Sequence, residues 1–311
     1  MSGAYTDLHQ LVELGANART LGIYSAQHVR SALSGQHRSR LRGRGIDFDE
    51  VRRYQAGDDI RSIDWRVTAR SGVPHTKLYR EERERPVVIL LDQSPAMFFG
   101  TQLNFKSVTA AECAAALAWA ALEHGDRVGG MLATGKQEPL VRPYRSQRIL
   151  FHWLQTIAVA NAKLNAELDP APADYFAQAL INAQHSLDTG AALFIISDGQ
   201  ALTPDCEPHL HRLAKHHDLL FVRISDRLEQ SPPPQGYYPI NDGTTGRATL
   251  LNTNSTAAQT QYEHLCHQQR SEMEQRLHRF QIPLVDLDCG QPTLPQLQRI
   301  FPGRATRSHN G

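Results

Sequence analysis

The residues of this sequence best suited to chemistry are two aspartates and a serine that follow apolar runs. Asp92 comes directly after the run at residues 87–91 and stands two positions before Ser94, and Asp198 follows shortly after the run at residues 193–196. Carboxylate and hydroxyl oxygens are the hard ligands that Mg²⁺ and Mn²⁺ prefer. Asp92, Ser94 and Asp198 are therefore the candidate metal ligands. The alternative is structural, with Asp92 and Ser94 capping the loop and helix that follow.

These side chains can meet only if the two apolar runs are neighbouring strands of one sheet. Runs rich in Val, Ile and Leu are typical of strands buried on both faces, and they cover residues 87–91, 128–133, 193–196, 219–224 and 282–287. Residues 138–142 follow a turn and are expected to add an antiparallel edge strand. Helical segments alternate with the strands, as in the alanine-rich residues 106–124, which stop at Gly125.

This alternation predicts an α/β fold, doubly wound around a mostly parallel sheet of about six strands with helices on both faces. In such a sheet the ligand crevice lies at the carboxyl ends of the strands, where the strand order reverses. We therefore expect Asp92 and Asp198 to end neighbouring strands and to face one crevice.

The chain divides into two regions with different sequence patterns. Residues 86–311 carry the strand–helix alternation, whereas residues 1–85 hold a loosely helical segment followed by a charged block. We expect residues 1–85 to be an N-terminal extension that packs on the sheet domain. Residues 231–255 begin near three prolines and contain an Asp-Gly pair, which predicts a hairpin inserted after the fifth strand.

Composition and charge exclude several classes of protein. The chain has 311 residues with 33 Lys and Arg against 32 Asp and Glu, a balance that argues against a general binder of nucleic acids or acidic membranes. No apolar stretch reaches the roughly 18 residues of a membrane-spanning helix, and no leader of signal-peptide type is evident. The four cysteines are far apart and form no CxxC pair. We expect reduced thiols in a cytoplasmic protein.

Two charged segments in the N-terminal region are open to more than one interpretation. Arginines alternate with small residues at Arg38, Arg40, Arg42 and Arg44, as in a solvated arm or an arm that contacts phosphate or an acidic partner. No aromatic stacking platform accompanies them, which disfavours nucleic acid. Farther along, charges of both signs are interleaved around Trp65, at Asp58, Asp59, Arg61 and Asp64. They are interpreted either as ion pairs that organise the backbone, with Trp65 buried against the sheet, or as a docking face for a partner.

The long charged block resembles the signature of the bacterial "domain of unknown function 58" family. The resemblance rests on residues 39–48 (SRLRGRGIDF), 51–65 (VRRYQAGDDIRSIDW), 68–72 (TARSG) and 79–83 (YREER), and it runs from about Gly35 to the C-terminal strand. Residues 92–96 (DQSPA) are similar to part of the metal-ion-dependent adhesion site of von Willebrand factor A domains, Asp-x-Ser-x-Ser.

The resemblance implies a von Willebrand A-like domain with an adaptor or chaperone-like role beside a MoxR-type AAA+ ATPase and other A-domain proteins. It also implies that the metal site is degenerate. Ala96 replaces the second serine ligand, and the usual threonine falls at Asp174 or is absent, whereas Asp198 matches the distal aspartate. We expect no required cofactor and weak or absent binding of Mg²⁺ or Mn²⁺. The residues expected to bind a partner are Arg40, Arg42, Arg44, Asp58, Asp59, Arg61, Asp64 and Trp65.

Two other functions remain as alternatives to a non-enzymatic interaction module. One is a metal-dependent hydrolase or phosphotransferase that uses Asp92, although a dehalogenase-type site needs a second acid where Ser94 stands. The sequence has neither a phosphate-binding Gly-x-x-x-x-Gly-Lys-Ser/Thr loop nor a Gly-x-Ser-x-Gly elbow. The other alternative is nucleic-acid binding through the arm at residues 38–44.

Overall fold

The protein folds into two compact units. The structure is a computed structural model that describes residues 3–22, 47–55, 63–80, 86–136, 140–241 and 248–302. One unit comprises Met1–Gln36 and Arg85–Gly311, and the other comprises His37–Glu84. The predicted extension over residues 1–85 is therefore not one segment, because its first part belongs to the unit that contains the sheet.

A six-stranded sheet forms the centre of the larger unit, with the strand order β10-β7-β6-β3-β4-β5. All neighbouring pairs from β10 to β4 are parallel, and β5 pairs antiparallel with β4. The strands are β3 (Pro86–Asp92), β4 (Arg127–Ala133), β5 (Val141–Tyr144), β6 (Ala192–Ser197), β7 (Asp218–Ser225) and β10 (Leu284–Asp288). The chain passes from β3 to β4 and β5 and then returns to β6 on the other side of β3. The predicted doubly wound α/β sheet is confirmed.

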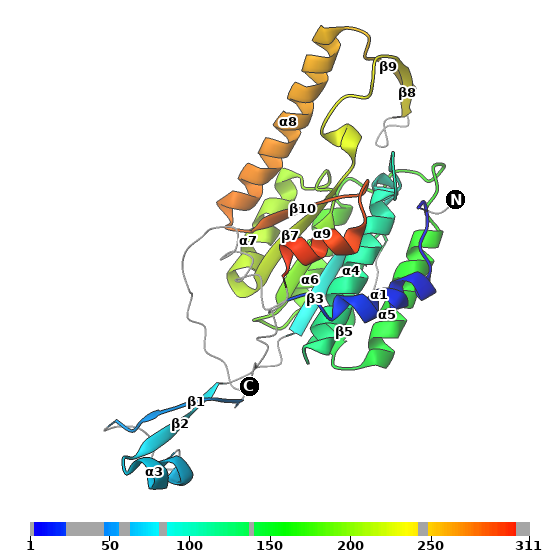
Figure 1. Ribbon diagram of the computed structural model, residues 1–311. Helices are drawn as coiled ribbons and strands as arrows, with labels where there is room; N and C mark the ends of the chain where they lie inside the picture. The colour runs from blue at the N-terminus through cyan, green and yellow to red at the C-terminus, as the bar shows by residue number, and fades with distance from the viewer. Residues whose placement is uncertain are drawn as a thin grey trace. The chain divides into compact units, whose positions relative to one another are not determined.

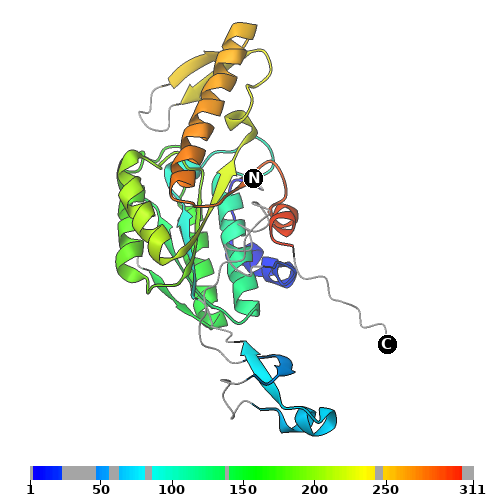
Figure 2. The same ribbon diagram turned by 90° about the vertical axis from the view of Figure 1, so that its left-hand side faces the viewer.

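Helices cover both faces of the sheet because its central strands are apolar on both sides (Figure 2). On β3, Val87 and Ile89 face one core, whereas Val88 and Leu90 face the other. The first core is completed by α1 (Leu8–Ala18), α4 (Lys106–Glu123), α5 (Gln147–Ala162) and α9 (Thr293–Ile300). The second is completed by α6 (Tyr175–Ser186), α7 (Glu207–His216) and the last turns of α8 (Thr256–Arg279).

Helix α4 is the most deeply buried helix of the described chain, and its small residues explain why. Alanines at eight of its 18 positions allow close packing against the sheet on one side and α1 on the other. The indole of Trp119 donates to the carbonyl oxygen of Leu11 at 3.1 Å, which joins α4 to α1. The helix ends as predicted, since Gly125 takes the positive φ of +89° that closes a helix. Helix α4 thus brings its first residue, Lys106, to the carboxyl edge of the sheet.

The predicted insert is present as a hairpin with a long helix behind it. Strands β8 (Tyr237–Asn241) and β9 (Ala248–Asn252) pair antiparallel, and α8 follows them (Figure 1). Of the 24 residues of α8, only Met273 and Leu277 are buried. Figure 1 shows the hairpin and most of α8 extending beyond the sheet. No helix among the described residues has the length and apolar character needed to cross a membrane.

The smaller unit contains the antiparallel pair β1 (Asp47–Arg53) and β2 (His75–Arg80) with the short helix α3 (Trp65–Ser71). Asp64 caps α3, because its carboxylate accepts the amides of Arg66 at 3.0 Å and Val67 at 3.2 Å. Trp65 is 68% exposed, so the smaller unit does not bury it in a core of its own. The reason is local: Trp65 opens a seven-residue helix that buries none of its residues.

Candidate functional site

The two predicted aspartates meet at the carboxyl edge of the sheet. Strand β3 ends at Asp92, and its parallel neighbour β6 ends at Ser197, directly before Asp198. The strand order reverses between these two strands. The prediction that Asp92 and Asp198 follow the ends of neighbouring strands is therefore confirmed, and it follows from the apolar runs that make β3 and β6 neighbours at the centre of the sheet.

Asp92 is fully buried and its carboxylate is surrounded by hydrogen-bond donors. Oδ1 accepts the Ser94 amide at 3.0 Å. Oδ2 accepts the Ser197 hydroxyl at 2.7 Å and the Tyr175 hydroxyl at 3.0 Å. The Tyr175 oxygen also lies 3.1 Å from the hydroxyl of Ser94. Asp92 and Ser94 are thus part of an internal network that joins β3, β6 and the start of α6.

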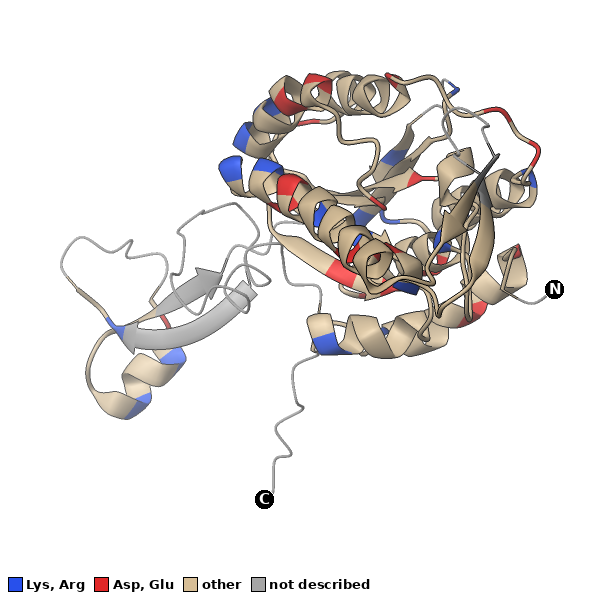
Figure 3. Cartoon of the chain, turned by 90° about the horizontal axis from the view of Figure 1, so that it is seen from above, with Lys and Arg blue, Asp and Glu red and all other residues tan. Residues whose placement is uncertain are grey.

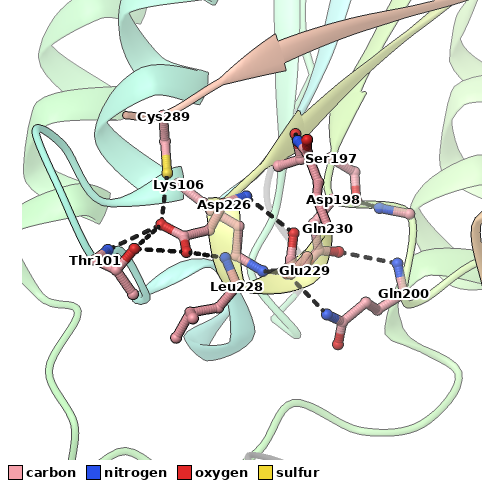
Figure 4. Close-up of polar contacts among 12 residues, drawn as sticks. Thr101, Lys106, Ser197, Asp198, Gln200, Asp226, Leu228, Glu229, Gln230 and Cys289 are labelled. Carbon is pink, nitrogen blue, oxygen red and sulfur yellow. Dashed lines mark hydrogen bonds and ion pairs between the residues drawn. The ribbon is translucent and has the colours of Figure 1, made fainter. Parts of the chain in front are cut away.

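Asp198 belongs to a second network, centred on the ammonium group of Lys106 (Figure 4). The Lys106 Nζ atom lies 2.7 Å from Asp198 Oδ2 and 2.6 Å from Glu229 Oε1, and the Lys106 side chain is only 2% exposed. The other oxygen of Asp198 accepts the Gln200 amide at 2.9 Å. Gly199 makes this turn possible, because φ is +82° there.

Glu229 and Asp226 extend this network to the end of β7. Glu229 Oε1 accepts the Gln200 side-chain amide at 3.1 Å, and Oε2 accepts the Asp226 backbone amide at 3.1 Å. The Asp226 carboxylate accepts the Thr101 amide and hydroxyl, the Leu228 amide and the Cys289 thiol (Figure 4). The loops after β3, β6, β7 and β10 are therefore joined at one edge by buried carboxylates.

Burial and neighbouring charges together raise the pKa of Asp92, Lys106 and Tyr175. Burial raises the pKa of Asp92 to about 6, with a further increase from the nearby charge of Asp198 that the hydrogen bonds from Ser197 and Ser94 only partly offset. Burial alone would lower the pKa of Lys106, but the charges of Asp198 and Glu229 outweigh it and hold that pKa above its ordinary value. Burial also raises the pKa of Tyr175, reinforced by Asp92, so its hydroxyl stays protonated and can donate.

The comparisons with known proteins identify the family. The profile of the family described as "Protein of unknown function DUF58" matches residues 50–272, which is more than half of the chain. The chain belongs to the DUF58 family. Uncharacterized proteins of Mycobacterium bovis and Mycobacterium tuberculosis are 27% identical to it over 295 residues, which cover 94% of this chain and 90% of theirs.

Solved structures similar to this DUF58 chain include a conserved hypothetical protein and a von Willebrand factor type A protein. A conserved hypothetical protein BatB from Bacteroides thetaiotaomicron is 13% identical, with a TM-score of 0.37 over 70% of this chain and 98% of that one. A von Willebrand factor type A protein from Catenulispora acidiphila is 19% identical, with a TM-score of 0.31 over 49% of this chain and 35% of that one.

The A-domain resemblance of this DUF58 chain implies a divalent cation on Asp92, Ser94 and Asp198, but the donor set does not fit one. A metal ligand must direct a lone pair at the ion. The oxygens of Asp92 accept an amide and two hydroxyl groups, and Asp198 is paired with an ammonium group. No group of three or more His, Cys, Asp or Glu placed to hold a metal occurs in the part of the chain that the structure describes.

The remaining predicted residues of the DUF58 chain make none of the contacts described for these two networks. Ala96 is exposed in the short turn Pro95–Met97, and Asp174 is exposed before α6, where its neighbour Tyr175 makes the contact to Asp92. Asp64 and Trp65 lie in the smaller unit. The partner-binding residues Arg40, Arg42, Arg44, Asp58, Asp59 and Arg61 lie outside the described residues.

Sequence reasoning missed Lys106, Tyr175, Ser197, Asp226 and Glu229. A weak signal existed for two of them. Lys106 is a lone basic residue at the start of an alanine-rich helix, and Asp226 follows the apolar run of β7 just as Asp198 follows that of β6. Nothing in the spacing of Tyr175 or Glu229 indicated a role.

A separate cavity of about 590 Å³ lies at the opposite edge of the sheet, where β3 and β4 begin. Arg127, Arg142 and His185 line it, together with the apolar floor residues Val88 and Ala191. It contains none of the predicted site residues. The candidate site is therefore the network at the carboxyl edge.

Proposed function

We propose that this chain is a non-enzymatic protein-interaction module that serves as an adaptor or chaperone-like partner of a MoxR-type AAA+ ATPase and other A-domain proteins. The observation that carries the proposal is that the carboxylates of Asp92, Asp198 and Asp226 and the ammonium group of Lys106 are buried and paired within the protein. Asp92, Ser94, Lys106 and Asp226 are at most 2% exposed. Such an edge supports a fixed surface for recognition rather than a site that reacts with a substrate.

The competing hydrolase or phosphotransferase function requires a reactive Asp92. A carboxylate nucleophile must direct a free lone pair at the substrate. Asp92 is buried, and Ser94, Ser197 and Tyr175 donate to it or contact its network. These contacts favour a structural role for Asp92 and support the interaction module over the enzyme.

Nucleic-acid binding through the arm at residues 38–44 is the second alternative, and those residues lie outside the described chain. In the part that the structure describes, Lys and Arg segments are interspersed with Asp and Glu segments (Figure 3). A phosphate-binding surface gains affinity from basic groups concentrated on one face. The mixture seen in this view favours a protein partner.

Exposed apolar side chains beside the buried network supply a contact surface. In the loop after β3, Phe99 is 40% exposed and Leu103 is 48% exposed. The Phe99 ring lies beside the Lys106 ammonium group, with its centroid 5.6 Å from Nζ. Aromatic and large apolar groups on a rigid support are typical anchors of protein interfaces. We therefore assign the docking surface to this loop, next to a degenerate metal site that binds Mg²⁺ or Mn²⁺ weakly or not at all.

The proposal places the domain in the cytoplasm. Cys113, Cys206, Cys266 and Cys289 are all free, which is compatible with a reducing compartment. A cytoplasmic ATPase partner would require that location.

Affinity capture with the full chain from the native cytoplasm, followed by surface plasmon resonance with the ATPase that co-purifies, tests the proposal. Phe99→Ser should weaken the complex, because it removes an anchor from the docking loop. Tyr144→Ser is the matched control, since Tyr144 is 52% exposed but ends β5 at the opposite edge of the sheet. Equal losses from both variants would contradict the assigned surface. Phosphatase or ATPase activity of the purified chain that depends on Asp92 would favour the enzyme instead.

A further inference from the structure

Lys106 is an ammonium group enclosed at the point where A-domain resemblance implies a metal ion. It begins α4, in which most other residues are small or apolar, and its side chain is 2% exposed. A charge is stable in such a place only if it is paired and hydrogen-bonded. Asp198 and Glu229 provide the pairing, at 2.7 and 2.6 Å from Nζ.

We propose that the Lys106 ammonium is the resident cation of this crevice and takes the place of a divalent metal ion. It neutralises Asp198, the residue that matches the distal metal ligand, and bridges it to Glu229 in the segment after β7. A metal ion that bridges two carboxylates would hold the same two loops together. The ammonium does so without exchanging with solvent, because it is covalently attached to α4.

With Lys106 in place, both oxygens of the Asp198 carboxylate and both oxygens of the Glu229 carboxylate have a hydrogen-bond donor. Asp198 uses its second oxygen for the Gln200 backbone amide, and Glu229 uses its second oxygen for the Asp226 amide. A Mg²⁺ ion could bind these carboxylates only by displacing the ammonium group of Lys106. That group cannot diffuse away, because it is part of the side chain. Mg²⁺ is often bound by one or two carboxylates and several waters, so the same two carboxylates would suffice once the ammonium is gone.

This inference differs from the explanation that the sequence suggests. The sequence attributes weak metal binding to the missing ligand at Ala96, whereas the structure attributes it to Lys106. Ala96 is exposed in the turn after β3. Restoring the motif with Ala96→Ser should therefore leave the crevice unable to bind Mg²⁺ as long as Lys106 is present.

Titration calorimetry with MgCl₂ and MnCl₂ on the full chain distinguishes the two explanations. Lys106→Met, which keeps the length of the side chain and removes its charge, should gain saturable binding at millimolar Mg²⁺. Wild type, Ala96→Ser and the charge-retaining Lys106→Arg should not. The double variant Lys106→Met/Asp198→Asn should lose the gained binding. Saturable binding to wild type that Lys106→Met leaves unchanged, or gained by Ala96→Ser alone, would overturn the inference.

Thermal unfolding provides a second readout if Lys106→Met is poorly folded without metal. Added Mg²⁺ should raise the melting temperature of Lys106→Met and leave that of wild type unchanged, since only a ligand that binds the folded state stabilises it. A Lys106→Met protein that stays unfolded at every Mg²⁺ concentration contradicts the inference. No partner protein is needed, so the result is independent of whether the docking loop binds an ATPase.

Discussion

The Nζ atom of Lys106 lies 2.7 Å from Oδ2 of Asp198, although the two residues are 92 positions apart in the sequence. The contact joins the first turn of α4 to the end of β6, across the place where the strand order reverses. It joins the start of α4 to the loop that follows β6. The carboxyl edge of the sheet is therefore rigid where an open α/β sheet would otherwise offer a crevice.

Removing the charge of Lys106 should cost much more stability than removing an exposed cation. In Lys106→Met, Asp198 is left buried without a counter-ion and the partly exposed Glu229 also loses its partner. Breaking a buried pair such as Lys106–Asp198 costs about 3–5 kcal/mol. The control is Arg279→Ala: its ion pair with Glu207 is exposed, and such pairs contribute about 0–1 kcal/mol. Urea unfolding in the absence of divalent ions measures both. Equal losses would show that the buried pair contributes no more than the exposed one.

Tyr175→Phe should destabilise the fold and make Asp92 harder to ionise. The variant removes a 3.0 Å hydrogen bond to a buried carboxylate, and a hydrogen bond to a charged group contributes about 1.5–3 kcal/mol. Tyr5→Phe is the control, because its hydroxyl donates to the neutral carbonyl of Leu164 and should cost about 0.5–1.5 kcal/mol. The carboxyl carbon resonance of Asp92, followed by NMR against pH, should titrate at a higher pH in Tyr175→Phe. An unchanged titration would show that Tyr175 does not donate to Asp92.

Asp92 and Asp226 should give stability profiles of opposite slope with pH. The pKa of Asp92 is raised from 3.8 to about 6, so the folded state binds a proton that the unfolded state releases, and the contribution of Asp92 to stability falls as pH rises from 3.8 to about 6. For Asp226, burial raises the pKa, but hydrogen bonds from Leu228 and Thr101 outweigh it and lower the pKa below 3.8. The stability that Asp226 contributes is therefore present above pH 3.8 and is lost as the pH falls below that value.

Denaturant unfolding of Asp92→Asn and Asp226→Asn across this range isolates each contribution. The difference in unfolding free energy between wild type and Asp92→Asn should change with pH mainly between 3.8 and about 6. The corresponding difference for Asp226→Asn should change only at lower pH. A flat difference for Asp92→Asn would mean that Asp92 keeps its ordinary pKa.

Reversing the arginine arm should slow association with the ATPase partner more than removing Asp92 does. The triple variant with Glu at Arg40, Arg42 and Arg44 reverses the charge of an arm that can steer an acidic partner. Asp92→Ala, in contrast, changes a buried group. Added salt should weaken the complex, because exposed charges are screened beyond about 8 Å at physiological ionic strength. Surface plasmon resonance measures the rates. Loss of binding in EDTA, with the association rate of the triple variant unchanged, would show that a metal bridge carries recognition.

The elements that surround the site could be predicted from the sequence because burial leaves a local pattern. Val87 and Val88 face different cores, so β3 had to be apolar at every position from 87 to 91, and the same holds for residues 192–196 of β6. The hairpin around residues 237–252 followed from its turn residues. The convergence of Asp92 and Asp198 followed from the topology of a doubly wound sheet.

The contacts of these aspartates could not be predicted, because they depend on how distant helices pack. Lys106 reaches Asp198 only because α4 crosses the first face of the sheet, and Tyr175 reaches Asp92 from α6 on the second face. The hydrophobic periodicity of a segment does not indicate which distant side chain that segment will contact. Trp65 shows the converse, since a large aromatic residue suggested burial where a short helix leaves it exposed.

Helix α8 holds the β8–β9 hairpin at the end that lies far from the sheet, so a tilt of the helix at the sheet moves the hairpin. Its buried residues, Met273 and Leu277, lie near the end that meets the sheet. At 1.5 Å per residue, Thr256 stands about 26 Å from Met273, so a tilt of about 10° at the base displaces the hairpin by about 4 Å. The Tyr262 hydroxyl donates a hydrogen bond to the Leu228 carbonyl oxygen at 2.7 Å, which joins the middle of α8 to the residue next to Glu229. A shift of the segment that holds Leu228 and Glu229 would therefore reach the hairpin through Tyr262 and α8.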